Sequence, residues 1–297
     1  MPAEGAVPKS GHAIFLVRHG ETVSNTEGRY HGRLDSPLTE RGVGQARAIG
    51  RRLRLSPDAM RAAIVSSPQP RARRTAEFIR ECLGESAPQV QLDEQLCEVS
   101  IGRWEGLREA EIAAVAPGTF EGAGRHEWCF SASGRETYEV FKARIAQWLT
   151  ERSDQACRIV VTHGIVARVL RGLYAGLPRS DALSLLIPQD RIYRLADGII
   201  EEIAVADAPP VPRICRVAAL DGGCLDVAFE DGIAGTIDVV GRFSGGVGCA
   251  MEPAGFARVA IDDFGGVCWP GGFGITAQAL HDDLTRQTTA SGGGKIG

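Results

Sequence analysis

The chain has 297 residues, of which 44% are hydrophobic and 24% are charged, a composition typical of a soluble globular protein. No apolar run reaches the ~18 residues of a membrane-spanning helix and no secretory signal is visible, so we expect a cytoplasmic protein without a membrane partner. The formal net charge is −4 and basic residues form no block, which argues against nucleic acid as a partner. The eight cysteines are scattered without a Cys-x-x-Cys pair, so their spacing predicts no metal site.

Short apolar strands alternate with longer amphipathic helices over the first two thirds of the chain. This alternation predicts a three-layer α/β/α sandwich, in which helices cover both faces of a mostly parallel sheet. In chain order we expect a strand at 13–17, a helix at 38–55 capped by Thr39, a strand at 62–67, helices at 71–83 and 138–152, a strand at 158–163, a helix at 165–176, a hairpin at 190–205, further strands within 214–240 and a helix at 275–287.

The composition changes after residue 205. Up to that point the chain carries 27 Lys and Arg against 26 Asp and Glu, and beyond it 6 against 11, so net charges of +1 and −5 distinguish the two parts. We expect a first domain at 12–205, a Pro-rich linker at 206–213, a small α+β domain at 214–287 and a disordered tail at 288–297.

Two of the expected strands end in His-Gly. The stretch "AIFLVRHG" ends at His19 and Gly20, and "RIVVTHG" ends at His163 and Gly164. Ligands of open α/β sheets bind beyond the carboxyl ends of the strands, so the two histidines and the serines at 66–67 should meet at one edge. The glycines permit a sharp turn and a close approach of ligand to backbone.

Arginine and amide donors surround this edge. Arg18 precedes the first histidine, and Arg71 begins the helix after the second strand. A guanidinium group suits a tetrahedral phosphate, and a neutral imidazole can attack phosphorus. Asn25 and Gly32 could add an amide and a backbone N–H. The residues therefore predict phosphoryl transfer, with no metal or other cofactor.

An acid is also needed for the leaving oxygen. The stretch "LCEVSIGRWEG" offers two carboxyl groups, Glu98 and Glu105. Residue chemistry alone leaves both open.

Five segments, in this order, resemble the histidine phosphatase superfamily, the phosphoglycerate mutase-like group. The resemblance spans about 12–205, with Arg135 and Thr137 as departures. The segments are "LVRHGETVSNTEGRYHGRLDSPLTERGVGQA" (16–46), "VSSPQPRARRTAE" (65–77), "LCEVSIGRWEGL" (96–107), "RETYEVFKAR" (135–144) and "VVTHG" (160–164).

The resemblance implies roles for the residues of this chain. It implies that His19 is the phosphorylated nucleophile and that Glu98, rather than Glu105, donates the proton. His31 stands where the family pattern has a small residue or glutamine, so its contribution stays open. By the same resemblance, Arg18, Arg71 and His163 hold the phosphoryl group, and Asn25, His31, Gly32 and Gly164 line the site.

The predicted activity is that of a phosphatase acting on a small phosphorylated metabolite through phosphohistidine. One alternative is a phosphoglycerate mutase, whose corresponding segment is longer and basic. Here the segment at 107–134 is short and mixed, which favours water as the acceptor. The other alternative is a non-catalytic sensor of a phosphorylated ligand, with the acidic second domain as effector. A sensor has no need of the acid.

The second domain resembles a small bacterial domain family of uncharacterised function over residues 211–287. The matching stretches are "VPRICRVAALDGGCLDVAFEDGIAGTIDV" and "GFARVAIDDFGGVCWPGGFGITAQAL". No cluster of catalytic residue types stands out there. Two interpretations remain: a passive stability or dimerisation module, and a module that binds a protein partner. Either one places a homo-oligomer or partner contact on this domain.

Overall fold

The protein forms two compact units in the computed structural model. The first contains the described residues of 1–24, 31–106 and 119–210, and the second those of 25–30, 107–118 and 211–297. The described residues are 12–120, 126–131, 136–151, 157–205, 212–239, 253–261, 265–269 and 273–292.

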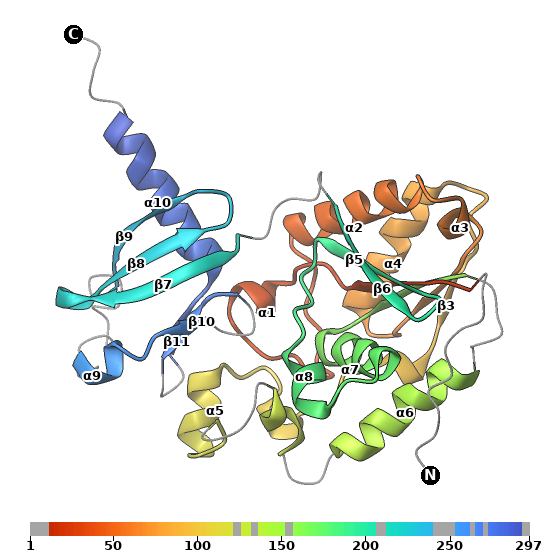
Figure 1. Ribbon diagram of the computed structural model, residues 1–297, viewed down its shortest axis with the longest axis horizontal. Helices are drawn as coiled ribbons and strands as arrows, with labels where there is room; N and C mark the ends of the chain where they lie inside the picture. Colours follow the sequence, from red (N-terminus) through yellow and green to blue (C-terminus); the bar gives the residue numbers. More distant parts are fainter. Residues whose placement is uncertain are drawn as a thin grey trace. The chain divides into compact units, whose positions relative to one another are not determined.

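A six-stranded sheet forms the centre of the first unit, in the order β3-β2-β4-β1-β5-β6 (Figure 1). The four strands from β3 to β1 are parallel, and β5 and β6 add an antiparallel hairpin at one edge. The prediction of a mostly parallel sheet is confirmed. The strands are β1 (Ile14–Arg18), β2 (Ala63–Ser66), β3 (Val90–Leu92), β4 (Arg158–Thr162), β5 (Arg191–Ala196) and β6 (Ile199–Ala204).

Four long helices cover the two faces of this sheet. They are α2 (Glu40–Leu53), α4 (Pro70–Leu83), α6 (Tyr138–Glu151) and α7 (Gly164–Ala175). Figure 1 shows α2 and α4 on one side and α6 and α7 on the other, which confirms the three-layer arrangement.

Alternating side chains of β1 pack into the apolar cores on the two faces of the sheet. Phe15 and Val17 pack in one buried cluster with Ile49 of α2 and Ile79 of α4. Leu16 lies between them in sequence, is also buried, and therefore faces the other side. The cap of α2 is confirmed as well, because the Thr39 Oγ1 accepts a hydrogen bond from the N–H of Gly42 at 3.0 Å.

Strand β3 has no counterpart in the sequence prediction, because its three residues present no apolar run.

Shorter elements connect these layers. The short elements are α1 (Val23–Thr26), α3 (Pro57–Met60), η1 (Glu94–Leu96), η2 (Gly102–Trp104), α5 (Glu109–Val115), η3 (Glu127–Phe130) and α8 (Arg179–Ser184). None of the described helices is both long enough and apolar enough to cross a membrane.

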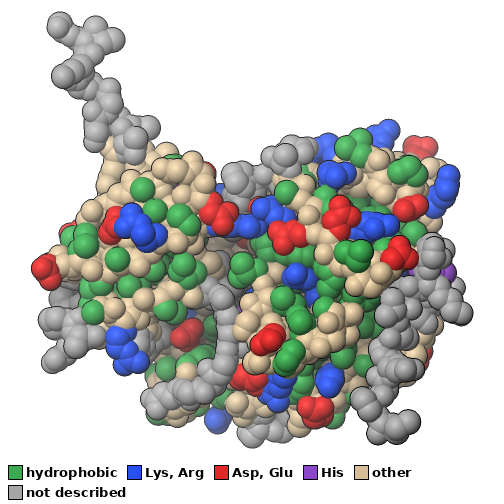
Figure 2. Space-filling model, in the orientation of Figure 1, with side chains coloured by type: hydrophobic (Ala, Val, Ile, Leu, Met, Phe, Trp, Pro, Cys, Tyr) green, Lys and Arg blue, Asp and Glu red, His purple; other side chains and the backbone are tan. Residues whose placement is uncertain are grey.

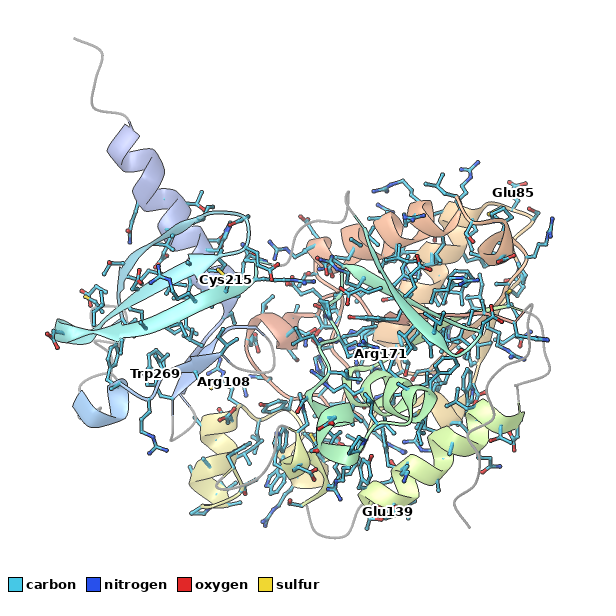
Figure 3. The ribbon with its side chains drawn as sticks, in the orientation of Figure 1. Glu85, Arg108, Glu139, Arg171, Cys215 and Trp269 are labelled. Atoms are coloured by element: carbon cyan, nitrogen blue, oxygen red, sulfur yellow. The ribbon has the colours of Figure 1, made fainter. Side chains whose placement is uncertain are left out.

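The second unit is built on two small antiparallel sheets, in agreement with the predicted α+β class. Its core includes Leu225, Leu280 and Trp269 (labelled in Figure 3), and the Trp269 Nε1 donates to the backbone oxygen of Phe256 at 2.8 Å. The elements are β7 (Ile214–Leu220), η4 (Asp221–Gly223), β8 (Cys224–Phe229), β9 (Ala234–Asp238), α9 (Pro253–Phe256), β10 (Ala260–Ile261), β11 (Val267–Trp269), β12 (Phe273–Ile275) and α10 (Ala277–Gly292).

Helix α10 is longer than predicted. The sequence prediction ends it at 287 and begins a disordered tail at 288, whereas the helix continues to Gly292. Each residue added to an existing helix gains a hydrogen bond without a new nucleation cost. The rest of the tail, 293–297, and most of the predicted linker, 206–211, lie outside the described residues.

Candidate active site

Strand pairing brings the two histidines together. β1 and β4 are parallel neighbours in which Arg18 lies opposite Thr162, so His19 and His163 follow at the same level. The His19 N–H donates to the Thr162 carbonyl at 2.8 Å, and the two imidazole rings lie 5.2 Å apart between centroids. Both residues are buried: the exposed fraction is 3% for His19 and 0% for His163. The structure therefore places both predicted histidines at one edge of the sheet.

The His19 ring has one nitrogen tied to the backbone. Its Nδ1 lies 2.8 Å from the Gly20 carbonyl oxygen, which can only accept, so Nδ1 carries the proton and Nε2 carries the lone pair. Burial holds the pKa of His19 well below its usual range, and the charges of Arg71 and Arg18 lower it further, against the opposing effect of the Gly20 hydrogen bond. At neutral pH the ring is an uncharged base with Nε2 available.

The turn that carries His19 needs a glycine. A Cβ on Gly20 would lie 2.4 Å from the backbone oxygen of Gly42, closer than any real contact. The Gly20 N–H donates to the Thr75 Oγ1 at 3.0 Å, and the same hydroxyl donates to the Arg71 carbonyl at 2.8 Å. This hydroxyl thus fixes the His19 turn against helix α4.

His163 has the complementary arrangement of nitrogens. Its Nε2 lies 2.8 Å from the Ser67 Oγ, whereas its Nδ1 is buried without a hydrogen-bond partner in the described parts of the chain. Burial, followed by the charge of Arg71, holds the pKa of His163 well below its usual range. Helix α7 starts at the next residue, Gly164, and so directs its positive end to this edge.

Arg71 is held by two backbone carbonyls. Its Nη1 donates to the Leu34 oxygen at 2.7 Å and its Nη2 to the Gly32 oxygen at 2.8 Å, while its Nε has no partner in the described ranges. Burial lowers the pKa of Arg71 to about 10, and the negative charges of Glu98 and Asp35 oppose this shift. The guanidinium is therefore a buried cation at neutral pH.

Arg18 is oriented by the segment that precedes β5. Its Nη1 donates to the Ile187 carbonyl at 3.0 Å. The adjacent carbonyl, that of Leu186, accepts hydrogen bonds from the Arg171 Nη1 at 2.8 Å and from the Tyr193 hydroxyl at 3.0 Å. Arg171, labelled in Figure 3, also lies 3.7 Å over the Tyr193 ring. These contacts fix the backbone that aims Arg18.

The two candidate acids lie in different surroundings. The Glu98 carboxylate accepts from the Ile165 N–H at the start of α7 and from the Val99 N–H, both at 3.0 Å. The Glu98 carboxylate therefore lies beside the second histidine, and its negative charge raises the pKa of Arg71. Glu105 accepts from the Ser100 hydroxyl at 3.0 Å.

Glu105 lies against the backbone of Gly32. A Cβ on Gly32 would lie 2.6 Å from the Glu105 Oε1, and its φ of +52° also favours glycine. The contact braces the turn whose carbonyl orients Arg71.

His31 is the third buried histidine of this region. Its ring meets the His19 ring edge to face at 6.0 Å, and its Nε2 lies 2.7 Å from the Thr22 Oγ1. Burial, followed by the charges of Arg71 and Arg18, lowers the pKa of His31 to about 3. Asn25 lies in α1 and belongs to the second unit, so its contribution stays a prediction.

The sequence pattern does not mark several polar residues that contact this site. Thr22, Gln69 and Thr75 have no spacing that distinguishes them from ordinary loop and helix residues, and the only sequence signal of Ser67 is its place at a strand end. In the described ranges, no group of three or more His, Cys, Asp or Glu residues could hold a metal ion. The basic and polar donors gathered here suit an anion instead.

Residues 14–196 match the family model of the histidine phosphatase superfamily, branch 1. The chain belongs to this superfamily. The match covers more than half of the chain and ends before the second domain predicted at 214–287, whose own family is not shown. The superfamily includes both phosphatases and phosphoglycerate mutases among the relatives of this chain.

Three relatives illustrate the range of proteins to which this chain is similar. One, named "Probable phosphoglycerate mutase GpmB", from Erwinia tasmaniensis, is 33% identical over 64% of this chain and 91% of its own. The adenosylcobalamin/alpha-ribazole phosphatase of Salmonella typhimurium is 30% identical over 59% and 86%. The solved structure of Bacillus stearothermophilus YhfR is 30% identical, covers 67% of this chain and 98% of its own, and has a TM-score of 0.55.

Proposed function

We propose that this protein is a phosphoric monoester hydrolase that cleaves a small phosphorylated metabolite through a phosphohistidine on His19. The observation that carries the proposal is the neutral His19 ring, with Nδ1 committed to the Gly20 carbonyl and Nε2 free to attack. A nucleophile of this kind, flanked by buried arginines and a second histidine, suits phosphoryl transfer. Phosphatase-named relatives support the same reaction class.

In the first step, the His19 Nε2 forms a bond to phosphorus while the ester P–O bond breaks. The electron pair of that bond goes to the leaving oxygen, which takes a proton from Glu98 in its protonated form. Arg71 and Arg18 neutralise the phosphoryl oxygens. In the tautomer in which the Ser67 hydroxyl donates its hydrogen bond to the His163 Nε2, the His163 Nδ1 carries the proton and can donate to the phosphoryl group, which matches the unpartnered buried Nδ1.

In the second step, water attacks the phosphohistidine. Glu98 takes the proton of the water, the P–N bond breaks, and its electron pair returns to Nε2. The products are inorganic phosphate and the starting form of the site. The same carboxyl group thus acts as acid and then as base.

Covalent labelling tests the proposal. Incubation with a labelled phosphomonoester and acid-free quenching should give acid-labile label on His19 and none in His19→Ala. His281→Ala is the matched control, because His281 lies in the second unit and contacts Asp231 there. Label that persists in His19→Ala would disprove the assignment.

Phosphoglycerate mutase activity is the second candidate, because one relative carries that name over 91% of its length. Reaction in ¹⁸O-labelled water separates the two. A phosphatase releases phosphate that contains one ¹⁸O atom, whereas a mutase moves the phosphoryl group between carbons of phosphoglycerate without releasing it. We expect labelled phosphate.

A further inference from the structure

One buried amide joins two loops of the candidate site. The Gln69 Oε1 accepts a hydrogen bond from the Glu98 N–H at 2.7 Å, and its Nε2 donates to the Gly32 carbonyl at 3.1 Å. The same carbonyl accepts from the Arg71 Nη2 at 2.8 Å. Gln69 is 8% exposed. A single side chain thus connects the backbone that carries the candidate acid to the turn that orients the phosphate-binding arginine.

The backbone of Gln69 is fixed at the start of α4. Gln69 is the N-cap residue of α4, its carbonyl accepts from Ala72 and Arg73, and its own N–H donates to the Ser67 Oγ at 3.3 Å. An N-cap side chain usually accepts from the first turn of its helix, and serine, threonine, aspartate or asparagine does this best. The Gln69 side chain makes no such bond and reaches the two loops instead.

The Gln69 Oε1 also accepts a third, longer hydrogen bond from the Ser67 Oγ at 3.5 Å. The two shorter hydrogen bonds of the amide differ in what would replace them. Without Gln69, the Gly32 carbonyl keeps the Arg71 guanidinium as its donor partner. The Glu98 N–H, by contrast, has no other acceptor among the described residues. Loss of the amide should therefore disturb the position of Glu98 more than that of Arg71.

We propose that Gln69 is a positioning residue that acts through Glu98, holding the proton donor at the leaving-group oxygen. The inference rests on the proposed function, in which Glu98 protonates that oxygen. A residue of this role affects the first step, the transfer to His19, only as far as the leaving group needs a proton. A residue that merely supports the fold would slow all substrates alike.

The test compares two leaving groups in matched variants of the full chain. Gln69→Met removes both polar groups of the amide and keeps the unbranched shape. Gln69→Glu keeps an oxygen that can accept from the Glu98 N–H. Gln45→Met is the control, because Gln45 is also buried and accepts from the Glu21 N–H, on the His19 loop. Each variant is assayed for kcat/KM on p-nitrophenyl phosphate and on an alkyl phosphate, because kcat/KM reports the transfer to His19 and not the later hydrolysis of the phosphohistidine, which is common to both substrates.

We expect Gln69→Met to lower kcat/KM on the alkyl phosphate by about ten- to a hundredfold, the effect of an unpaired buried donor. The loss on p-nitrophenyl phosphate, whose leaving group needs little protonation, should stay below about threefold. Gln69→Glu should restore most of the ratio between the two substrates. Gln45→Met should change both substrates by the same factor.

A double-variant cycle with Glu98→Gln decides whether the effect runs through Glu98. In the Glu98→Gln background, Gln69→Met should cause no further loss on the alkyl phosphate. Multiplying losses, or equal losses on both substrates in Gln69→Met, would overturn the inference. If Glu98→Gln by itself slows both substrates equally, the fault lies in the proposed role of Glu98 instead.

Discussion

Lowering the pH from 7 to 5 should destabilise the folded protein because three buried histidines resist protonation. His19, His31 and His163 all have a pKa below that of a free histidine, chiefly because of burial. The unfolded chain binds protons at these residues from about pH 6.5 downward. The folded protein does not, so the unfolded state gains stability as the pH falls.

The size of this destabilisation follows from the pH range between the pKa of a histidine in the unfolded chain and its pKa in the folded protein. For His31, whose pKa is lowered to about 3, the free energy of unfolding falls as the pH drops from about 6.5 to about 3. At pH 5 the loss from His31 is about 2 kcal/mol, at about 1.4 kcal/mol per pH unit. The pKa values of His19 and His163 are lowered in the same direction, so both add to the loss from His31.

Urea unfolding measured at several pH values between 7 and 5 checks this reasoning. The free energy of unfolding should fall as the pH drops below about 6.5, with a slope steeper than His31 alone would give. The His31→Gln variant keeps a donor that can reach the Thr22 hydroxyl, and should lose about one proton of slope. If its slope equals that of the unchanged protein, the buried neutral His31 is not a source of acid sensitivity.

The remaining predictions concern a glycine, metals and the second unit. Gly20→Ala should destabilise the protein by about 1–3 kcal/mol in thermal unfolding, because its Cβ would meet the Gly42 oxygen, whereas Gly255→Ala meets nothing within 4 Å and should leave the midpoint nearly unchanged. Phosphatase activity should survive dialysis against a strong chelator, since Arg18 and Arg71 supply the positive charge; a loss that Mg²⁺ or Zn²⁺ restores would contradict this. A chain that ends at residue 208 should still become labelled on His19, because all the candidate catalytic residues lie between 18 and 164. Absence of label in such a folded chain would contradict the assignment of the chemistry to the first unit.

Much of the fold follows from the sequence alone. Regular periodicity located α2, α4, α6 and α7 to within two residues at each end, and apolar runs located β1, β2 and β4. The convergence of His19 and His163 was also predictable. Parallel strands end at a common edge, so two strands that each end in His-Gly must present their histidines together.

The tertiary structure alone decided how these groups are held. The contacts of Gln69 with Glu98, of Ser67 with His163 and of Arg71 with Gly32 join residues 29 to 96 positions apart. Such hydrogen bonds leave no periodic signal, because a glutamine or serine in a loop looks the same whether it faces water or a buried partner. The protonation state of each histidine is likewise set by burial and by neighbouring charges from other strands and helices, which exist only once the chain has folded.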